Sequence, residues 1–477
     1  MLWPPTAAPE PCTGIRSRSA GSPSSPAPTC SVCGARSGGI MSSENKVVVE
    51  ERMPMQTESP PNQGAFGLVH DQALPLLVQL SAFLFGALAL SVPSGYSYGP
   101  ALLLLASLCF FAVRRLNWVL PRELKFIGLG LSLYFLVMVI SVWFDGGKIS
   151  QIDRASRALM AVVILPLLAC VPVRLPILLS GCGVGALLAC GIAIHDKFIL
   201  GYERAFNDMM PLQSGNIAMS LGLFCLCGLL WAQKKGKLAF SFFMLLGGCA
   251  GMGASFLSGT RGGWVLLPVI LFTIAVLFKE CMYRKTTLVM LVGGLLCGGF
   301  LIVQPQSGVE ARIELAQNDI SQYLDKTNLN TSLGIRLQLW QSAWQSFTEK
   351  PLFGWGNHGI RQSQKAQLAR GEISQFIYDF NSHAHNQFLD EMAKRGIVGL
   401  GALLLMMLIP LFLVKSRLHR PHNDDVHCGS ALVIVAVFSS IDYCLSQAFF
   451  GHNSGITFFV SSLVIAASIV FKESDTE

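Results

Sequence analysis

The chain has 477 residues, of which 52% are hydrophobic and 13% are charged, and its formal net charge is +7. A soluble globular protein carries about 25% charged residues, so the composition excludes a disordered chain and an ordinary soluble enzyme. With a mean hydropathy of +0.51, the sequence predicts an all-α polytopic membrane protein. We interpret the positive charge as a sign of topology rather than of nucleic-acid binding, because cytoplasmic loops collect Lys and Arg.

The first part of the chain, residues 1–70, differs from the rest. Residues 1–40 are rich in Pro, Ser, Gly and Ala, and they contain no apolar run that could form a signal-peptide core. We therefore expect residues 1–70 to be a disordered cytoplasmic tail, with Met41 as a candidate translation start. Cys30 and Cys33 have CxxC spacing, but no second pair or histidine cluster completes a zinc site.

Apolar runs near 20 residues recur from residue 74 and predict about 12 transmembrane helices. Helices 1–9 form a predicted domain at residues 71–303, helices 10–12 form one at 394–471, and 472–477 is a cytoplasmic tail. Two runs are short, so ten or eleven spans remain an alternative. The runs are 74–92, 99–113, 124–144, 157–172, 176–195, 212–232, 238–257, 263–279, 286–303, 396–414, 428–446 and 455–471.

The Lys and Arg residues in the short loops predict the orientation. With the N-terminus inside, the cytoplasmic loops hold more than twice as many of them as the opposite loops, and this bias favours an N-in/C-in topology. Arg154, Arg157 and Arg261 are among the few positive residues on the opposite side. Because these arginines run against the bias, they are candidates for a functional role.

One large loop, residues 304–393, separates predicted helices 9 and 10, and the orientation places it in the periplasm. A connection of this length is usually functional or disordered, and its apolar content argues against disorder. Apolar side chains at helical spacing predict an amphipathic helix near 332–348. Pro351 and a Gly-Trp-Gly turn end this helix. A second helix is expected at 359–371, and a third begins near His385 and leads into helix 10.

The segment 381–386, Asn-Ser-His-Ala-His-Asn, lies at the end of this loop and carries the richest set of reactive groups. His383 or His385 could act as a general base near neutral pH, at the membrane surface where lipid-linked substrates present their head groups. Asn386 is part of the same motif. Two alternatives stay open. The histidines could be a solvated pair that caps a helix, or they could bind a metal together with a neighbouring carboxylate or histidine.

Several arginines could form an anion site. Arg261 lies in a Gly-Thr-Arg-Gly-Gly-Trp turn, in which glycines allow close backbone approach and the arginine suits a phosphate or pyrophosphate. The alternative is a tight hairpin with a snorkelling arginine. Arg336 lies on the amphipathic helix, where it could equally be a surface residue. Arg154 and Arg157 lie one helical turn apart and, with His452, could line the same cavity or lie among head groups.

Other motifs are missing from the sequence. It contains neither a P-loop glycine–lysine motif nor a dinucleotide fingerprint, so we expect no nucleotide and no nucleic-acid partner. The large loop has no DxD-like acidic pair, and we expect no metal and no cofactor. If the protein is a transferase, its donor is then already activated and lipid-borne. Asp442 is the main charged residue inside the predicted spans, and it keeps a transporter or flippase as an alternative.

These motifs together resemble the O-antigen ligase superfamily of bacterial inner-membrane proteins. His385-Asn386, nine further residues and then Gly396-x-x-Gly399 match the ligase pattern of His-Asn/Ser/Gln, nine residues and Gly-x-x-Gly. The turn around Arg261, the helix that carries Arg336 and the large outer loop also fit. The resemblance covers roughly residues 74–471.

The resemblance implies an enzyme that transfers O-antigen polysaccharide from undecaprenyl diphosphate to a sugar of the lipid A core. This inverting glycosyl transfer would occur at the periplasmic face and need neither ATP nor metal. The resemblance also implies that His385 is the base and that Arg261 and Arg336 bind the diphosphate. The partners would be the lipid-linked donor, the lipid A-core acceptor and membrane lipid. An O-antigen polymerase and a protein O-oligosaccharyltransferase of the same superfamily remain alternatives.

Overall fold

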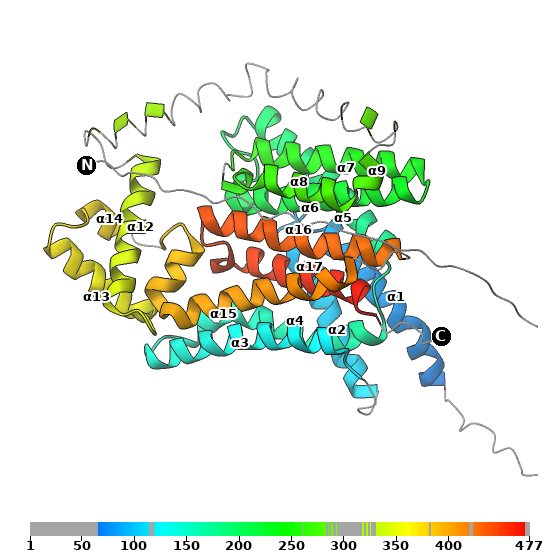
Figure 1. The fold of residues 1–477 in the computed structure, drawn as a ribbon, viewed down its shortest axis with the longest axis horizontal. Helices are drawn as coiled ribbons and strands as arrows, with labels where there is room; N and C mark the ends of the chain where they lie inside the picture. Colours follow the sequence, from blue (N-terminus) through cyan, green and yellow to red (C-terminus); the bar gives the residue numbers. More distant parts are fainter. Residues whose placement is uncertain are drawn as a thin grey trace, which may run out of the picture. The chain divides into compact units, whose positions relative to one another are not determined.

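The computed structural model describes residues 65–113, 119–260, 262–282, 331–380, 383–418 and 423–472, with a few isolated positions between 285 and 325. The chain divides into two units, 1–62 and 63–477, and all described residues belong to the second. The described residues contain helices and no strand (Figure 1). The predicted tail before residue 65, the predicted span 286–303 and Arg261 lie outside the described residues.

The described part of the chain matches eleven of the twelve predicted spans with a helix. Eight of its helices are long and apolar enough to cross a membrane, and two shorter apolar helices accompany them. The prediction of an all-α polytopic membrane protein is therefore confirmed. The α-helices are α1 (Ala65–Ala87), α2 (Tyr98–Val113), α3 (Arg122–Phe144), α4 (Asp153–Cys170), α5 (Leu175–Ile194), α6 (Pro211–Lys234), α7 (Leu238–Leu257), α8 (Leu267–Leu277), α9 (Lys279–Met282), α12 (Ser332–Glu349), α13 (Gly356–Ala369), α14 (Gln375–Phe380), α15 (Gln387–Leu418), α16 (Asp424–Ser446) and α17 (Asn453–Val470).

Three helices, α6, α16 and α17, form the centre of the bundle and are almost entirely buried. In Figure 1, α16 and α17 lie between α6–α8 and the group α3, α4 and α15. The surrounding helices bury less than about half of their residues and expose large apolar side chains, such as Leu129 on α3 and Phe412 on α15. In a multi-pass membrane protein such side chains face lipid, so the buried centre and the apolar outer surface define the membrane-spanning body.

Helices α3 and α15 pack against each other and run antiparallel. At one end of this pair, Arg417 Nη2 lies 2.7 Å from Glu123 Oε1. At the other end, α15 begins beside a group of three helices, α12, α13 and α14, which we call the module (residues 331–380). Figure 1 shows the module at this end of the bundle. The amphipathic helix predicted near 332–348 is α12, and the one predicted at 359–371 is α13.

Candidate active site

A sharp kink divides α15 at Gly396, which has φ 62° and ψ −155°. The turn that follows α12 lies against this kink, because Ile397 N donates to Pro351 O (2.8 Å) and Val398 N donates to Leu352 O (3.3 Å). A Cβ on Gly396 would lie 2.5 Å from Pro351 O and would collide with the Leu352 carbonyl. The first glycine of the Gly-x-x-Gly motif is thus required by close backbone packing and by a backbone conformation that is open essentially only to glycine.

A second set of contacts attaches the start of α13 to α15 and α3. Trp355 N donates to Ala393 O (3.0 Å), which joins the turn to α15. Asp145, at the end of α3, accepts hydrogen bonds from His358 N (2.6 Å) and Gly359 N (3.3 Å). The carboxylate therefore caps the N-terminus of α13, although Asp145 and His358 are 213 positions apart in the chain. The sequence offered no local signal for Asp145, because capping residues normally precede the helix that they cap.

The histidine segment, residues 383–386, lies between the module and α15, and hydrogen bonds to α15 hold it in place. Asn386 Oδ1 accepts from Phe388 N (3.0 Å) and Leu389 N (3.2 Å), so Asn386 is the N-cap of α15. Asp390 Oδ1 accepts from Ala384 N (3.1 Å). The asparagine of the His-Asn motif therefore has a structural function that the sequence analysis did not assign.

The backbone of His385 is in the left-handed region, with φ 49°. Its N–H donates to His383 Nδ1 (3.2 Å), and the two rings meet edge to face with centroids 4.4 Å apart. Left-handed backbone costs a non-glycine residue of the order of 1–3 kcal/mol, and such strain concentrates at functional sites. The hydrogen bond shows that His383 Nδ1 carries no proton, so its neutral ring holds the strained His385 in position.

Burial and neighbouring charges keep both imidazoles neutral at physiological pH. Desolvation is the largest cause that lowers the pKa of His383 to about 4, and the proximity of His385 adds to it. Burial also lowers the pKa of His385, and the positive charge of Arg336 lowers it further. The carboxylate of Asp390 acts on both histidines in the opposite direction. A neutral imidazole can accept a proton, which is the chemistry expected of a general base, and the charge of Arg336 keeps His385 in this neutral form.

A third histidine joins the pair from the other end of the sequence. The rings of His452 and His383 have centroids 6.2 Å apart. Burial lowers the pKa of His452, and the charge of Arg154 lowers it further. Arg157 Nη2 lies 3.0 Å from Asp153 Oδ1 on its own helix. The structure thus gathers His383, His385 and His452 and brings Arg154 within electrostatic reach, whereas Arg157 pairs with a neighbour on α4.

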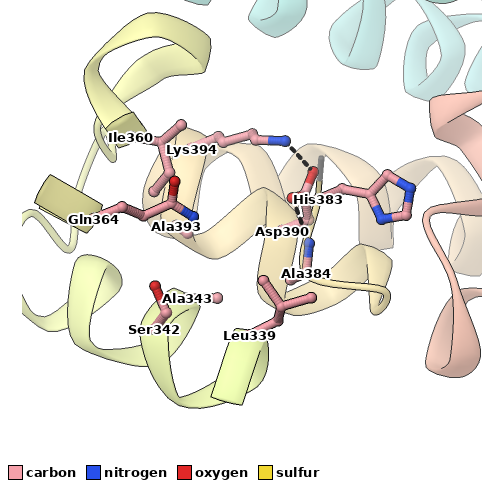
Figure 2. Close-up of a pocket in the computed structure, with 10 residues that line it drawn as sticks. All are labelled: Leu339, Ser342, Ala343, Ile360, Gln364, His383, Ala384, Asp390, Ala393 and Lys394. Atoms are coloured by element: carbon pink, nitrogen blue, oxygen red, sulfur yellow. Dashed lines mark hydrogen bonds and ion pairs between the residues drawn. The ribbon is translucent and has the colours of Figure 1, made fainter. Parts of the chain in front are cut away.

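A small pocket of about 330 Å³, measured to its open mouth, adjoins the histidine segment. Figure 2 shows it between α12, α13 and α15, with the Asp390–Lys394 ion pair on one wall and the His383 ring at its edge, turned away from α12 and α13. The lining mixes apolar and polar side chains: Leu339, Ser342, Ala343, Ile360, Gln364, His383, Ala384, Asp390, Ala393 and Lys394. The pocket offers a partly polar space beside the histidines.

Two acid–base pairs on α15 were missed by the sequence analysis. Asp390 Oδ2 lies 2.7 Å from Lys394 Nζ, and Glu391 Oε2 lies 2.7 Å from Arg395 Nη1, and all four side chains are largely buried. Arg395 Nη2 also donates to Asn357 Oδ1 (3.2 Å), which ties α15 to α13. The i,i+4 spacing of acid before base is a visible sequence signal for such pairs. That signal could have identified the two pairs from the sequence.

The turn around Arg261 is described only at its flanking residues. Gly263 lies against α6, because a Cβ there would be 2.6 Å from Asn216 Oδ1, and Gly262 lies against Ser446 of α16. These glycines allow the turn to pack closely against the buried helices α6 and α16. This packing explains them without close backbone approach to a ligand. Within the described residues, no group of three or more His, Cys, Asp or Glu has the arrangement to hold a metal ion.

Comparisons with known proteins connect this arrangement to a family. The family described as O-Antigen ligase matches residues 251–404. This stretch includes the turn around Arg261, the module, the histidine segment and the kink of α15. An uncharacterized protein of Haemophilus influenzae is 33% identical over 400 residues, which cover 83% of this chain and 99% of that protein.

Proposed function

Because this chain belongs to the O-antigen ligase/polymerase superfamily, we propose that it is an O-antigen ligase that joins O-antigen polysaccharide to a sugar of the lipid A core. The members of the superfamily are membrane enzymes of the glycosyltransferase type. The donor is O-antigen linked to undecaprenyl diphosphate, and the acceptor is the lipid A core. The protein lies in the bacterial inner membrane with both termini inside, and its active site faces the periplasm. No cofactor takes part.

One observation carries the proposal: His385 is a neutral histidine in a strained backbone conformation, beside the charge of Arg336. In the reaction, His385 accepts the proton of the acceptor hydroxyl while the hydroxyl oxygen attacks the anomeric carbon of the donor sugar. The bond from that carbon to the diphosphate oxygen breaks, and the diphosphate leaves with the electron pair. A single displacement inverts the configuration. A positioned base typically contributes about 10²–10⁴-fold to the rate.

Arginines at the donor side complete the proposed mechanism. The leaving diphosphate develops negative charge, and a guanidinium can bind two of its oxygens at once. We assign Arg336 and Arg261 to this role. Removing one such preorganised contact typically costs about 3–4 kcal/mol of transition-state stabilisation. The same charge on Arg336 lowers the pKa of His385, so one residue serves both the leaving group and the base.

The test is complementation of a deletion strain with wild-type protein, His385→Ala and a control, His358→Ala. His358 is an exposed histidine of the same module, and its ring Nε2 lies 3.3 Å from Gln151 Nε2. We expect His385→Ala to leave lipid A without polymer and to accumulate polymer on the carrier lipid, while His358→Ala restores attachment. Both variants should be present in the membrane at wild-type levels. Near-normal transfer by purified His385→Ala would contradict the assignment of the base.

The same strains separate the ligase from related activities. Loss of all polymer, including polymer on the carrier lipid, would indicate an O-antigen polymerase. Loss of protein glycosylation with intact lipopolysaccharide would indicate a protein O-oligosaccharyltransferase. The match of His385-Asn386 and Gly396-x-x-Gly399 to the ligase pattern supports the ligase.

A further inference from the structure

Five large apolar side chains lie exposed at the end of the bundle that carries the module, and we call them the rim patch. Their exposed fractions are 81% for Trp143, 86% for Phe144, 85% for Ile149, 60% for Leu352 and 74% for Phe353. Three of them belong to the end of α3 and the following turn, and two belong to the turn between α12 and α13. Exposed apolar groups of this size indicate an interaction surface.

Short contacts hold the two halves of the rim patch beside each other. Asp145 directly follows Phe144 and accepts hydrogen bonds from the start of α13. A Cβ on Gly356 would lie 2.5 Å from Asp145 Cγ, so the turn that carries Leu352 and Phe353 reaches the end of α3. Leu352 O also accepts from Val398 N on α15. Both halves of the rim patch therefore lie at the same end of the α3–α15 pair.

The length of α3 places the rim patch at the edge of the hydrocarbon layer. The opposite end of the pair is marked by the ion pair between Glu123 and Arg417. From Glu123 to Asp145 the helix rises about 33 Å, at about 1.5 Å per residue. The hydrocarbon core of a bilayer is about 30 Å thick. If the ion pair lies at one surface of the hydrocarbon layer, the rim patch lies at the other.

The surroundings of the rim patch match this depth. Apolar side chains along the same helices, such as Ile140 on α3 and Ile397 on α15, are also exposed, so the rim patch lies at the end of helices that carry lipid-facing side chains. Two exposed lysines, Lys148 and Lys350, flank the rim patch, and the ammonium of Lys350 lies 3.7 Å from the centre of the Trp355 ring. Aromatic side chains and lysines are the residues that anchor proteins at the head-group level.

We propose that the rim patch inserts into the boundary between the acyl chains and head groups of bilayer phospholipids, and that the 351–353 turn thereby anchors the module to the membrane. The module is then held by its protein contacts with α15 and with Asp145 at the end of α3, and also by lipid. The combined attachment to protein and lipid fixes the height of the histidine segment above the hydrocarbon layer. Continuity with the lipid-facing surface favours phospholipid over a second protein chain as the occupant.

The test is photocrosslinking of the full-length protein in phospholipid vesicles, with p-benzoylphenylalanine in place of Phe353. The same group in place of Phe144 is the positive reference, and in place of Phe376 on α14 it is the matched control, because Phe376 is an exposed phenylalanine of the module outside the rim patch. We expect mass spectrometry to find phospholipid adducts at positions 353 and 144 and not at 376. Substitution of Leu352 provides a second probe if position 353 does not tolerate the group.

Other adducts would overturn the proposal. A polypeptide adduct at position 353 would make the rim patch a protein interface, and a polyprenyl adduct would make it part of the donor site. A 353 variant that is folded and inserted but gives no lipid adduct would place the turn in water. The readout needs no glycosyl transfer, so it stands independently of the proposed function.

Discussion

Replacing Gly396 with alanine should release the module from α15 without changing any polar group. Gly396 has a positive φ, and a Cβ added to it would collide with the carbonyls of Pro351 and Leu352. Alanine would need either a different backbone conformation or a displacement of the 351–353 turn. Either change breaks the hydrogen bonds that Ile397 and Val398 donate to that turn.

Two contributions determine how far Gly396→Ala should destabilise the protein. A non-glycine residue in this region of φ/ψ space costs about 1–3 kcal/mol. Forcing a methyl group into a packed contact costs about another 1–3 kcal/mol. The sum is a destabilisation of about 2–6 kcal/mol. It weakens the contact between the kink of α15 and the 351–353 turn. If the 351–353 turn detaches from α15, part of this cost is avoided. The histidine segment would then lose the support of the module.

Gly401→Ala is the matched control, because Gly401 lies in the same helix and a Cβ there would meet no atom within 4 Å. Alanine at a helical position is favoured over glycine by up to about 1 kcal/mol. The assay is thermal unfolding of the purified variants, combined with hydrogen exchange of residues 351–360. We expect Gly396→Ala to unfold at a lower temperature with faster exchange, and Gly401→Ala to match wild type or exceed it. Equal stability and exchange in both variants would refute the reasoning.

Four further predictions concern charge and hydrogen bonding around the histidine segment and at the start of α13. Asp390→Asn removes an anion that raises the pKa of His385, so the acidic limb of the pH–activity profile should move to lower pH. Arg336→Gln removes a cation that lowers the same pKa, so the acidic limb of its residual activity should move to higher pH. If the acidic limbs of the two variants moved in the same direction, these signs would be contradicted. Folding lowers the pKa of His383 from its usual value near 6.5 to about 4, so wild-type stability should fall as pH drops through this window. His383→Gln should show a smaller drop in unfolding temperature than wild type between pH 7.5 and pH 5. Asp145→Ala removes the acceptor for two N–H groups at the start of α13 and should cost about 1 kcal/mol, seen as faster hydrogen exchange in that first turn and nowhere else in the module.

The sequence by itself determined the class of the protein and the position of its described helices. Composition excluded a soluble enzyme, and apolar runs located eleven spans, because length and hydropathy are local properties that the bilayer requires of every crossing helix. Helical periodicity located α12 and α13 within a few residues of their observed bounds. The motif His385-Asn386 with Gly396-x-x-Gly399 pointed to the family before any contact was known.

Only the tertiary structure decided how these parts meet. No local pattern shows that His452 reaches His383, or that Asp145 caps a helix that begins at Gly356. Such contacts join segments far apart in the chain, and they depend on how whole helices pack. The same holds for the backbone conformation of Gly396, whose positive φ lies at a kink that is bonded to the distant 351–353 turn. The sequence therefore identified the reactive residue types, and packing decided which of them lie together and in which protonation state.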